Sequence, residues 1–138
     1  HICSNGERHP NHTGIYSNVY VTIEDVNDDD LLRVLEYLNE DGSSSFARWF
    51  HRLNPTAASK VTIALYRLEH GNFSNVKGVG AGVYEYKIDF GPGYRIYFGK
   101  DGDRVIILLG GSDKKSQAVA IINAHTAWTK YKQRKTKS

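Results

Sequence analysis

The chain has 138 residues, with 18 Lys or Arg against 15 Asp or Glu, a net charge of +3 and a single cysteine, Cys3. One cysteine excludes an internal disulfide and a thiolate metal cluster. No apolar run approaches the roughly 20 residues that cross a bilayer, and the polar first 18 residues lack a signal-peptide pattern. These features indicate a globular protein in a reducing cytoplasmic compartment, with no membrane partner.

The charge is unevenly distributed along the chain. Residues 1–69 carry 6 Lys or Arg against 10 Asp or Glu, whereas residues 70–138 carry 12 against 5. Such asymmetry favours a polyanionic partner for the second half. A solvated surface that is merely lopsided explains it equally well, so both interpretations stay open.

The first part of the chain is expected to lie apart from the main domain. Residues 1–30 are predicted to be a leader or extension, partly disordered, or an added strand, because VYVTIEDV over 19–26 alternates with β-branched residues. Residues 31–138 are predicted to form a single domain. Its first segment, LLRVLEYLNE over 31–40, is compatible with a helix or a strand.

Two short helices are predicted next. The serines of 43–45 are N-cap candidates for the first helix, and Asn54-Pro55 opens the second. Gly71 is expected to end the second helix. Each helix has apolar residues at i, i+3, i+4, i+7, namely Phe46, Trp49, Phe50 and Leu53 in the first and Val61, Ala64, Leu65 and Leu68 in the second. Residues 72–82 read as a glycine-rich loop.

Residues 83–114 are predicted to form three strands joined by turns at Gly91-Pro92-Gly93 and Asp101-Gly102. A three-residue first loop pairs Asp89 with Arg95. The apolar run VIILL over 105–109 is typical of a central strand, expected to end at Gly110-Gly111. A final helix is predicted after Asp113-Lys114-Lys115-Ser116, with an apolar side of Ala118, Ile121, Ile122 and Trp128, a structural His125 and a basic end over 130–138.

Alternation along the first two strands of 83–114 separates an apolar face from a polar one. The apolar face is predicted to be core and holds Tyr86, Ile88, Phe90, Tyr94, Ile96 and Phe98. The polar face is where function is expected, and it holds Glu85, Lys87, Asp89, Arg95 and Tyr97. Lys114 and Lys115 are predicted to lie near the same edge.

Lysine and arginine on adjacent strands suit RNA cleavage without a metal. Arginine binds phosphate oxygens in a bidentate manner, and crowded cations lower the pKa of a lysine so that it can act as a general base. Tyr97 can stack on a base or relay a proton. The alternative, that Asp89–Arg95 and Lys87–Glu85 are ordinary ion pairs, stays open. No HExxH or GxSxG motif is present, and no metal or other cofactor is expected.

Several stretches of the chain resemble the HigB-like addiction-module killer proteins of the RelE/ParE toxin superfamily. The matching stretches are EYLNEDGSSSFARWFHRL (36–53), ALYRLEHGNFSNVKGVGAGVYEYKIDFGPGYRIYFG (64–99) and ILLGG with KKSQ and AWTKYKQRK beyond it. The resemblance implies an α+β fold with a small antiparallel sheet, an N-terminal helical hairpin packed on it and a C-terminal helix. It also implies that residues 33–39 form the first strand.

The resemblance further implies the toxin of a type II toxin–antitoxin module, a ribosome-dependent, metal-independent endoribonuclease that acts as an mRNA interferase. Its expected partners are mRNA on the ribosome and a helix-turn-helix antitoxin, with operator DNA bound only through the antitoxin. The expected catalytic residues are Lys87, Arg95, Tyr97 and Lys114. The expected RNA-binding residues are Lys77, Lys115, Lys132 and Arg134.

Two other functions are compatible with the same resemblance. One is a ParE-type toxin that inhibits DNA gyrase and has no nuclease activity. The other is a degenerate, inactive module member, since Ala120-Ile121 stands where the killer proteins often carry Asp-Ile.

Overall fold

The computed structural model describes residues 30–137, and the predicted strand over 19–26 lies outside them. The described elements, in chain order, are β1 (Arg33–Glu36), α2 (Ser45–Phe50), α3 (Pro55–Glu69), β2 (Val76–Gly78), β3 (Val83–Ile88), β4 (Tyr94–Asp101), β5 (Val105–Asp113) and α4 (Gln117–Lys137). Helices and strands therefore both contribute, which confirms the α+β class. No described helix is long and apolar enough to cross a membrane.

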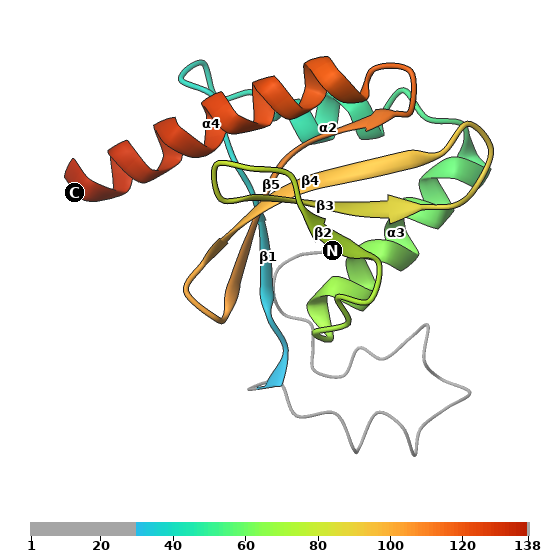
Figure 1. Ribbon diagram of the computed structural model, residues 1–138, viewed down its shortest axis with the longest axis horizontal. Helices are drawn as coiled ribbons and strands as arrows, with labels where there is room; N and C mark the ends of the chain where they lie inside the picture. The colour runs from blue at the N-terminus through green and yellow to red at the C-terminus, as the bar shows by residue number, and fades with distance from the viewer. Residues whose placement is uncertain (1–29, 138) are drawn as a thin grey trace. The chain divides into compact units, whose positions relative to one another are not determined.

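The five strands form one mixed sheet with the order β1-β5-β4-β3-β2 (Figure 1). β1 runs parallel to β5, and every other neighbouring pair is antiparallel. The prediction of an antiparallel sheet was therefore wrong at one edge. After β1 the chain passes through α2 and α3 and re-enters the sheet at the far edge as β2. The strands β3, β4 and β5 then return across the sheet, and β5 becomes the neighbour of β1.

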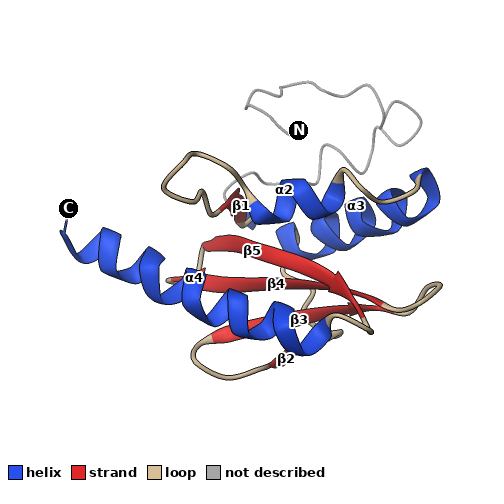
Figure 2. Cartoon of the chain, turned by 90° about the horizontal axis from the view of Figure 1, so that it is seen from above, coloured by secondary structure: helices blue, strands red, loops and turns tan. Residues whose placement is uncertain are grey.

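Helices cover both faces of the sheet, as Figure 2 shows. On one face, α2 and α3 bury Trp49, Val61 and Leu68 against the side of the sheet that carries Ile96 and Phe98. On the other face, α4 buries Ala124 and Trp128 against Val83, Tyr97 and Ile107. The sheet is thus the middle of three layers, and the predicted core face of β3 and β4 is confirmed.

The starts of α2 and α3 follow from local hydrogen bonds. Ser44 Oγ accepts from the Ala47 amide at 3.0 Å, and Asn54 Oδ1 accepts from the Ala57 amide at 2.8 Å. Each bond satisfies an amide that has no partner within its helix. The predicted N-caps are therefore confirmed, and a proline at the first position of α3 fits its missing amide.

The turn between β3 and β4 is longer than predicted. Ile88 pairs with Tyr94, so residues 89–93 form a five-residue connection. Gly91 and Gly93 both have positive φ, at 56° and 82°, which lets the chain reverse within the loop. The two-residue shift leaves each side chain on its predicted face but changes its partner, so that Arg95 lies opposite Lys87 and not Asp89.

Two strand boundaries differ from the sequence prediction. The glycine-rich segment 72–82 contains the edge strand β2, which the sequence analysis missed. β5 does not end at Gly110-Gly111 but continues to Asp113. A Cβ at position 111 would lie 2.2 Å from the Trp49 ring, so glycine is the residue that allows α2 to pack onto this strand.

The buried side of α4 is rotated from the predicted one. Ile122 is 62% exposed and Ala118 is exposed, whereas Ala124 and Trp128 are buried. His125 Nε2 donates to the Val79 carbonyl at 2.9 Å, which confirms its structural role. The helix begins at Gln117, after Asp113 Oδ1 accepts from the Ser116 amide at 3.0 Å, and this start sets which residues face the sheet.

The basic end of α4 is held against the sheet. Lys135 forms an ion pair with Asp101, and the Tyr131 hydroxyl donates to the same carboxylate at 2.5 Å. Arg134 donates to the Leu38 carbonyl at 2.9 Å and stacks over the Tyr37 ring. The basic end predicted over 130–138 is therefore helical as far as Lys137.

Replacement of Asp101 by asparagine is expected to destabilise the protein at neutral pH by less than about 1 kcal/mol, the usual size for a solvent-accessible ion pair. Hydrogen bonds from Lys135 and Tyr131 hold the pKa of Asp101 below its ordinary value. The stabilisation is thus present above pH about 4 and is lost as the pH falls through the lowered pKa. Urea unfolding at pH 7 and pH 3 measures this, and a wild-type advantage that persists unchanged at pH 3 would contradict it.

Candidate functional site

The predicted site residues of the hairpin come together on three adjacent strands. Lys77 of β2 lies opposite Glu85 of β3, which lies opposite Tyr97 of β4. Lys87 and Arg95 form the next pair along β3 and β4. These side chains share the face of the sheet on which α4 packs, so the start of α4 determines which of them reach solvent.

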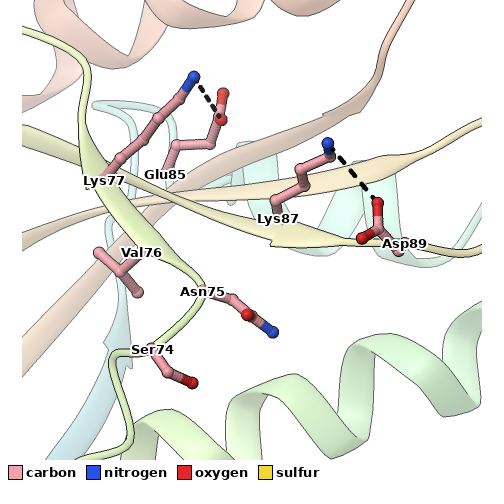
Figure 3. A pocket seen from close by; sticks show the side chains of 7 residues that line it. All are labelled: Ser74, Asn75, Val76, Lys77, Glu85, Lys87 and Asp89. Carbon is pink, nitrogen blue, oxygen red and sulfur yellow. Dashed lines mark ion pairs between the residues drawn. The ribbon is translucent and has the colours of Figure 1, made fainter.

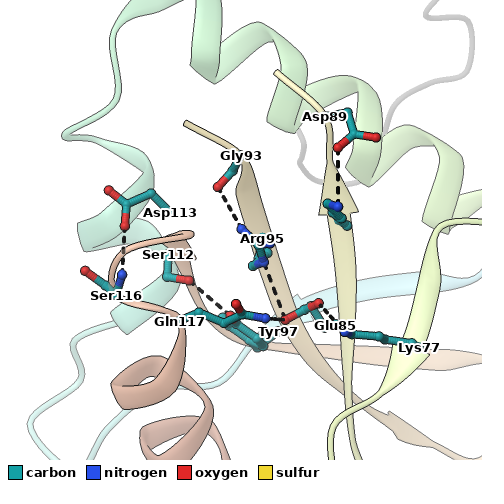
Figure 4. A network of polar contacts seen from close by, with 11 residues as sticks. Lys77, Glu85, Asp89, Gly93, Arg95, Tyr97, Ser112, Asp113, Ser116 and Gln117 are labelled. Atoms are coloured by element: carbon teal, nitrogen blue, oxygen red, sulfur yellow. Dashed lines mark hydrogen bonds and ion pairs between the residues drawn. The ribbon is translucent and has the colours of Figure 1, made fainter. Parts of the chain in front are cut away.

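Glu85 is the centre of a buried polar network, shown in Figure 4. Its side chain is 1% exposed, and its Oε1 atom accepts from Gln117 Nε2 at 2.9 Å. Lys77 Nζ lies 3.8 Å from Oε2, and Arg95 Nε lies 3.8 Å from Oε1. Two cations and one amide therefore surround this carboxylate, which rules out the alternative that Glu85 is a surface partner of Lys87.

Arg95 is buried beside Glu85, with 6% of its surface exposed. Its Nη1 donates to the Gly93 carbonyl at 3.0 Å, and its Nε finds no hydrogen-bond acceptor among the described residues. The Asp89–Arg95 ion pair, the alternative that the sequence left open, does not form, because the longer turn moves Asp89 beyond the end of β3. The Arg95 guanidinium is therefore held in place by the Gly93 carbonyl and the neighbouring Glu85 carboxylate.

Tyr97 is completely buried, and its hydroxyl shares a 3.0 Å hydrogen bond with Ser112 Oγ. Burial raises the pKa of Tyr97 to about 12, and the nearby Glu85 carboxylate acts in the same direction. The phenol therefore remains protonated at neutral pH. Its ring has no exposed face, which removes the predicted stacking on a base.

The exposed part of the site is an open pocket of about 250 Å³ at the β2 edge (Figure 3). Lys77 and Lys87 reach over it, with side chains that are 66% and 52% exposed. Lys87 Nζ lies 3.6 Å from the exposed Asp89 carboxylate. Ser74 and Asn75, which directly precede β2, also line the pocket. Each lysine thus has a carboxylate neighbour, and the two side chains are free to contact a ligand from solvent.

Lys114 and Lys115 lie in the exposed turn between β5 and α4. Tyr94 pairs with Asp113, and Lys114 lies beside the Gly93 turn that holds Arg95. Both lysines are thus near the Arg95 end of the site, as predicted.

Lys132 and Arg134 lie elsewhere. Arg134 is 17 positions beyond Gln117 on α4, which corresponds to about 25 Å along a helix. Lys132 lies over the Trp128 ring at 5.9 Å, and Arg134 contacts the chain after β1. These two residues stay predictions for RNA contact, but they are not part of the sheet site.

The residues that bury the network were not predicted from the sequence. Gln117 and Ser112 come from α4 and β5, far along the chain from Glu85, and no local pattern connects them. One signal was available in the sequence, because Glu85 stands between Tyr84 and Tyr86 in an otherwise apolar start of β3. Among the residues from 30 to 137, no three His, Cys, Asp or Glu side chains are placed to hold a metal ion.

Comparison with known proteins shows that the chain has a relative in a bacterium. It is 39% identical over 74 residues to an uncharacterized protein of Haemophilus influenzae, a match that covers 53% of this chain and 75% of the relative. The chain belongs to the family of that Haemophilus protein. No protein-family model matches the chain. Because the Haemophilus protein is uncharacterized, the function of its family has to be argued from the site.

Proposed function

We propose that the protein is the toxin of a type II toxin–antitoxin module, with a RelE/ParE-like fold, and that it cleaves mRNA on the ribosome. The observation that carries the proposal is the open pocket under Lys77 and Lys87, two exposed cations on adjacent strands. The resemblance of residues 36–53 and 64–99 to the killer proteins supports it, as does the basic second half of the chain. The partners included in the proposal are mRNA and a helix-turn-helix antitoxin in the cytoplasm.

The pocket offers groups for each step of RNA transesterification. The 2′-hydroxyl loses a proton and attacks the adjacent phosphorus, and the bond to the 5′-oxygen breaks, leaving a 2′,3′-cyclic phosphate and a 5′-hydroxyl. Lys77 and Lys87 neutralise the charge that develops on the phosphorane oxygens, and the Lys77 ammonium gives the departing 5′-oxygen its proton. Asp89 is the exposed carboxylate on the pocket wall, and it accepts the 2′-hydroxyl proton.

The buried ion pair of Glu85 and Arg95, below the pocket, has a positioning role in this proposal. Glu85 lies 3.8 Å from both Lys77 Nζ and Arg95 Nε, so its carboxylate holds Lys77 over the pocket while Arg95 offsets its charge. Arg95 and Tyr97 therefore act through other residues and not on the RNA directly. Lys114 and Lys115 extend the cationic surface at the Gly93 end.

The test is a double variant, Lys77→Ala with Lys87→Ala, induced in a bacterial host. The wild-type protein is expected to arrest growth and to cut mRNA inside reading frames, and the double variant is expected to cut at least about tenfold more slowly, because two charge-stabilising groups are lost. Primer extension on a test mRNA measures the cleavage. Both side chains are more than half exposed, so the fold is expected to be retained.

The matched control removes the same charge elsewhere. Arg67 and Arg104 are exposed and lie outside the pocket, so Arg67→Ala with Arg104→Ala is expected to leave cleavage unchanged. Equal cleavage by the wild-type protein and the Lys77/Lys87 variant would contradict the assignment of these lysines. Growth arrest without any mRNA cleavage would contradict the nuclease function.

Burial of Arg95 and Tyr97 favours a second candidate, a ParE-type toxin that inhibits DNA gyrase without cutting RNA. Two of the four residues expected to do chemistry have almost no access to a substrate. The same induction experiment separates the two functions, since gyrase inhibition gives an SOS response with intact mRNA. Absence of both effects indicates an inactive module member.

A further inference from the structure

A second groove lies at the opposite edge of the sheet from the Lys77/Lys87 pocket. Its walls are α2 and α4, and its floor is Leu109, Gly110 and Gly111 of β5, just beyond the residues that pair with β1. Figure 1 shows β1 and β5 side by side in the sheet. The groove has a volume of about 400 Å³. Its residues come from α2, β5 and α4 and from the segments that follow β1 and α2, and none of the residues predicted as functional lines it.

The charges in this groove have a single sign. Among its fourteen lining residues are the cations Arg48, Arg52 and Lys130, and there is no Asp or Glu. Arg48 lies on α2 and Arg52 in the turn that follows it, four positions further on, and Lys130 stands on the α4 wall. All three are exposed, and within residues 30–137 none of them takes part in an ion pair.

The Asp41 carboxylate interacts with Arg48, but its hydrogen bonds are made elsewhere. Its Oδ1 accepts from the Ser43 amide at 2.9 Å and from the Ser43 hydroxyl at 2.7 Å. These hydrogen bonds, with a smaller contribution from Arg48, lower the pKa of Asp41. The groove therefore keeps three cations that an anionic ligand can neutralise.

The floor of the groove is open because of a glycine. Gly110 faces the α4 side, opposite Tyr97, and a Cβ built at this position would meet nothing within 4 Å. Gly111, the next residue, faces Trp49 on the other side of the sheet. The space above Gly110 is thus not filled by the core and is accessible to a ligand between the two helices.

We propose that the groove between α2 and α4 binds the phosphate backbone of single-stranded RNA, at a second site separate from the Lys77/Lys87 pocket. Guanidinium groups on one wall and an ammonium on the other match successive phosphates along a strand. Asn123 on the α4 wall offers an amide that can hydrogen-bond to a base edge, which an acidic peptide would not require. The choice of RNA as the polyanion rests on the proposed function.

Fluorescence anisotropy with a short labelled single-stranded RNA tests the groove. Arg48→Ala with Arg52→Ala is expected to weaken binding about tenfold and to lower the salt slope of log K by about 1.4, since two phosphate contacts are lost at about 0.7 each. Gly110→Leu fills the groove at unchanged net charge and is expected to weaken binding comparably. The control variant Arg67→Ala with Arg104→Ala is expected to change affinity less than about twofold, because its charges lie outside the groove.

Three outcomes would overturn the inference. The first is an equal loss of affinity in the groove and control variants, which indicates non-specific attraction. The second is unchanged RNA affinity in both groove variants. The third is a wild-type affinity for a glutamate-rich peptide that the groove variants lose while RNA affinity stays constant, which identifies a protein as the occupant.

The binding assay also separates this inference from the proposed function. RNA bound through the groove by a wild-type protein that cuts no mRNA supports the groove and contradicts the nuclease. The opposite result is mRNA cleavage that depends on Lys77 and Lys87 together with an RNA affinity that neither groove variant changes. That result supports the nuclease function and contradicts RNA binding in the groove.

Discussion

Replacement of Glu85 by alanine is expected to destabilise the protein by about 3–5 kcal/mol, the usual cost of removing one partner from a buried ion pair. Glu85 is 1% exposed, and its loss leaves the buried Arg95 without a compensating charge. It also removes the acceptor of the Gln117 amide, which joins α4 to the sheet. Urea unfolding followed by the fluorescence of Trp49 and Trp128 measures the change.

Lys77 supplies the matched control, because it pairs with the same carboxylate from solvent. Lys77→Ala is expected to cost less than about 1 kcal/mol, since its own side chain is mostly exposed. A paired replacement, Glu85→Leu with Arg95→Met, is expected to recover much of the loss, because neither buried charge then remains. A cost for Glu85→Ala no larger than that for Lys77→Ala would contradict the buried network.

The same burial changes how Arg95 has to be tested. Arg95→Ala removes a guanidinium that is enclosed beside Glu85, so a loss of toxicity in this variant reports on folding as much as on chemistry. Substitution of the exposed Lys87 does not have this ambiguity. For this reason the function test uses the lysines of the pocket and leaves Arg95 to the stability measurement.

Replacement of Gly111 by alanine is expected to destabilise the protein by on the order of 2–4 kcal/mol, since overpacking a core forces its neighbours to move. The new Cβ would lie 2.2 Å from the Trp49 ring. That ring cannot easily move away, because Phe46 and Tyr94 pack around it with ring centroids at 5.8 and 6.4 Å. The midpoint of urea unfolding measures the effect.

The neighbouring glycine provides the control. Gly110→Ala adds the same methyl group on the opposite side of β5, where nothing lies within 4 Å, and is expected to change stability by less than about 0.5 kcal/mol. The two variants therefore differ only in which side of the strand receives the methyl group. Similar stabilities for both would mean that Trp49 does not pack on β5 as described.

Most of the local structure could be predicted from the sequence. Asn54-Pro55 and the serines before α2 cap their helices because capping depends on neighbouring residues alone. The faces of β3 and β4 also follow from alternation, which a two-residue change in the turn leaves intact. The cross-strand partners in the β3–β4 hairpin could not be predicted in the same way. They depend on the length of the loop, and the sequence Gly-Pro-Gly does not specify the φ values that set this length.

The candidate site was harder to predict because its burial is decided at long range. The tyrosines on either side of Glu85 are compatible with its burial, but no residue near Glu85 or Arg95 identifies α4 as the element that covers them, since Gln117 lies more than 20 residues further along. Strand alternation identifies a shared face and cannot say whether that face is open to solvent. The pairing of β1 with β5 likewise depends on residues about 70 positions apart.

That pairing has a consequence for the order in which the protein can fold during its own synthesis. The strand at one edge of the sheet is made first, and its neighbour in the sheet is made after all the other strands. In a nascent chain that ends before Val105, β1 has no partner strand, because it pairs with β5. The apolar sides of α2 and α3 then lack part of the sheet surface on which they pack. Because pairing between distant segments is slow, folding is completed only after β5 leaves the ribosome. A prematurely terminated chain of this length is therefore expected to be degraded and not to accumulate as an active fragment.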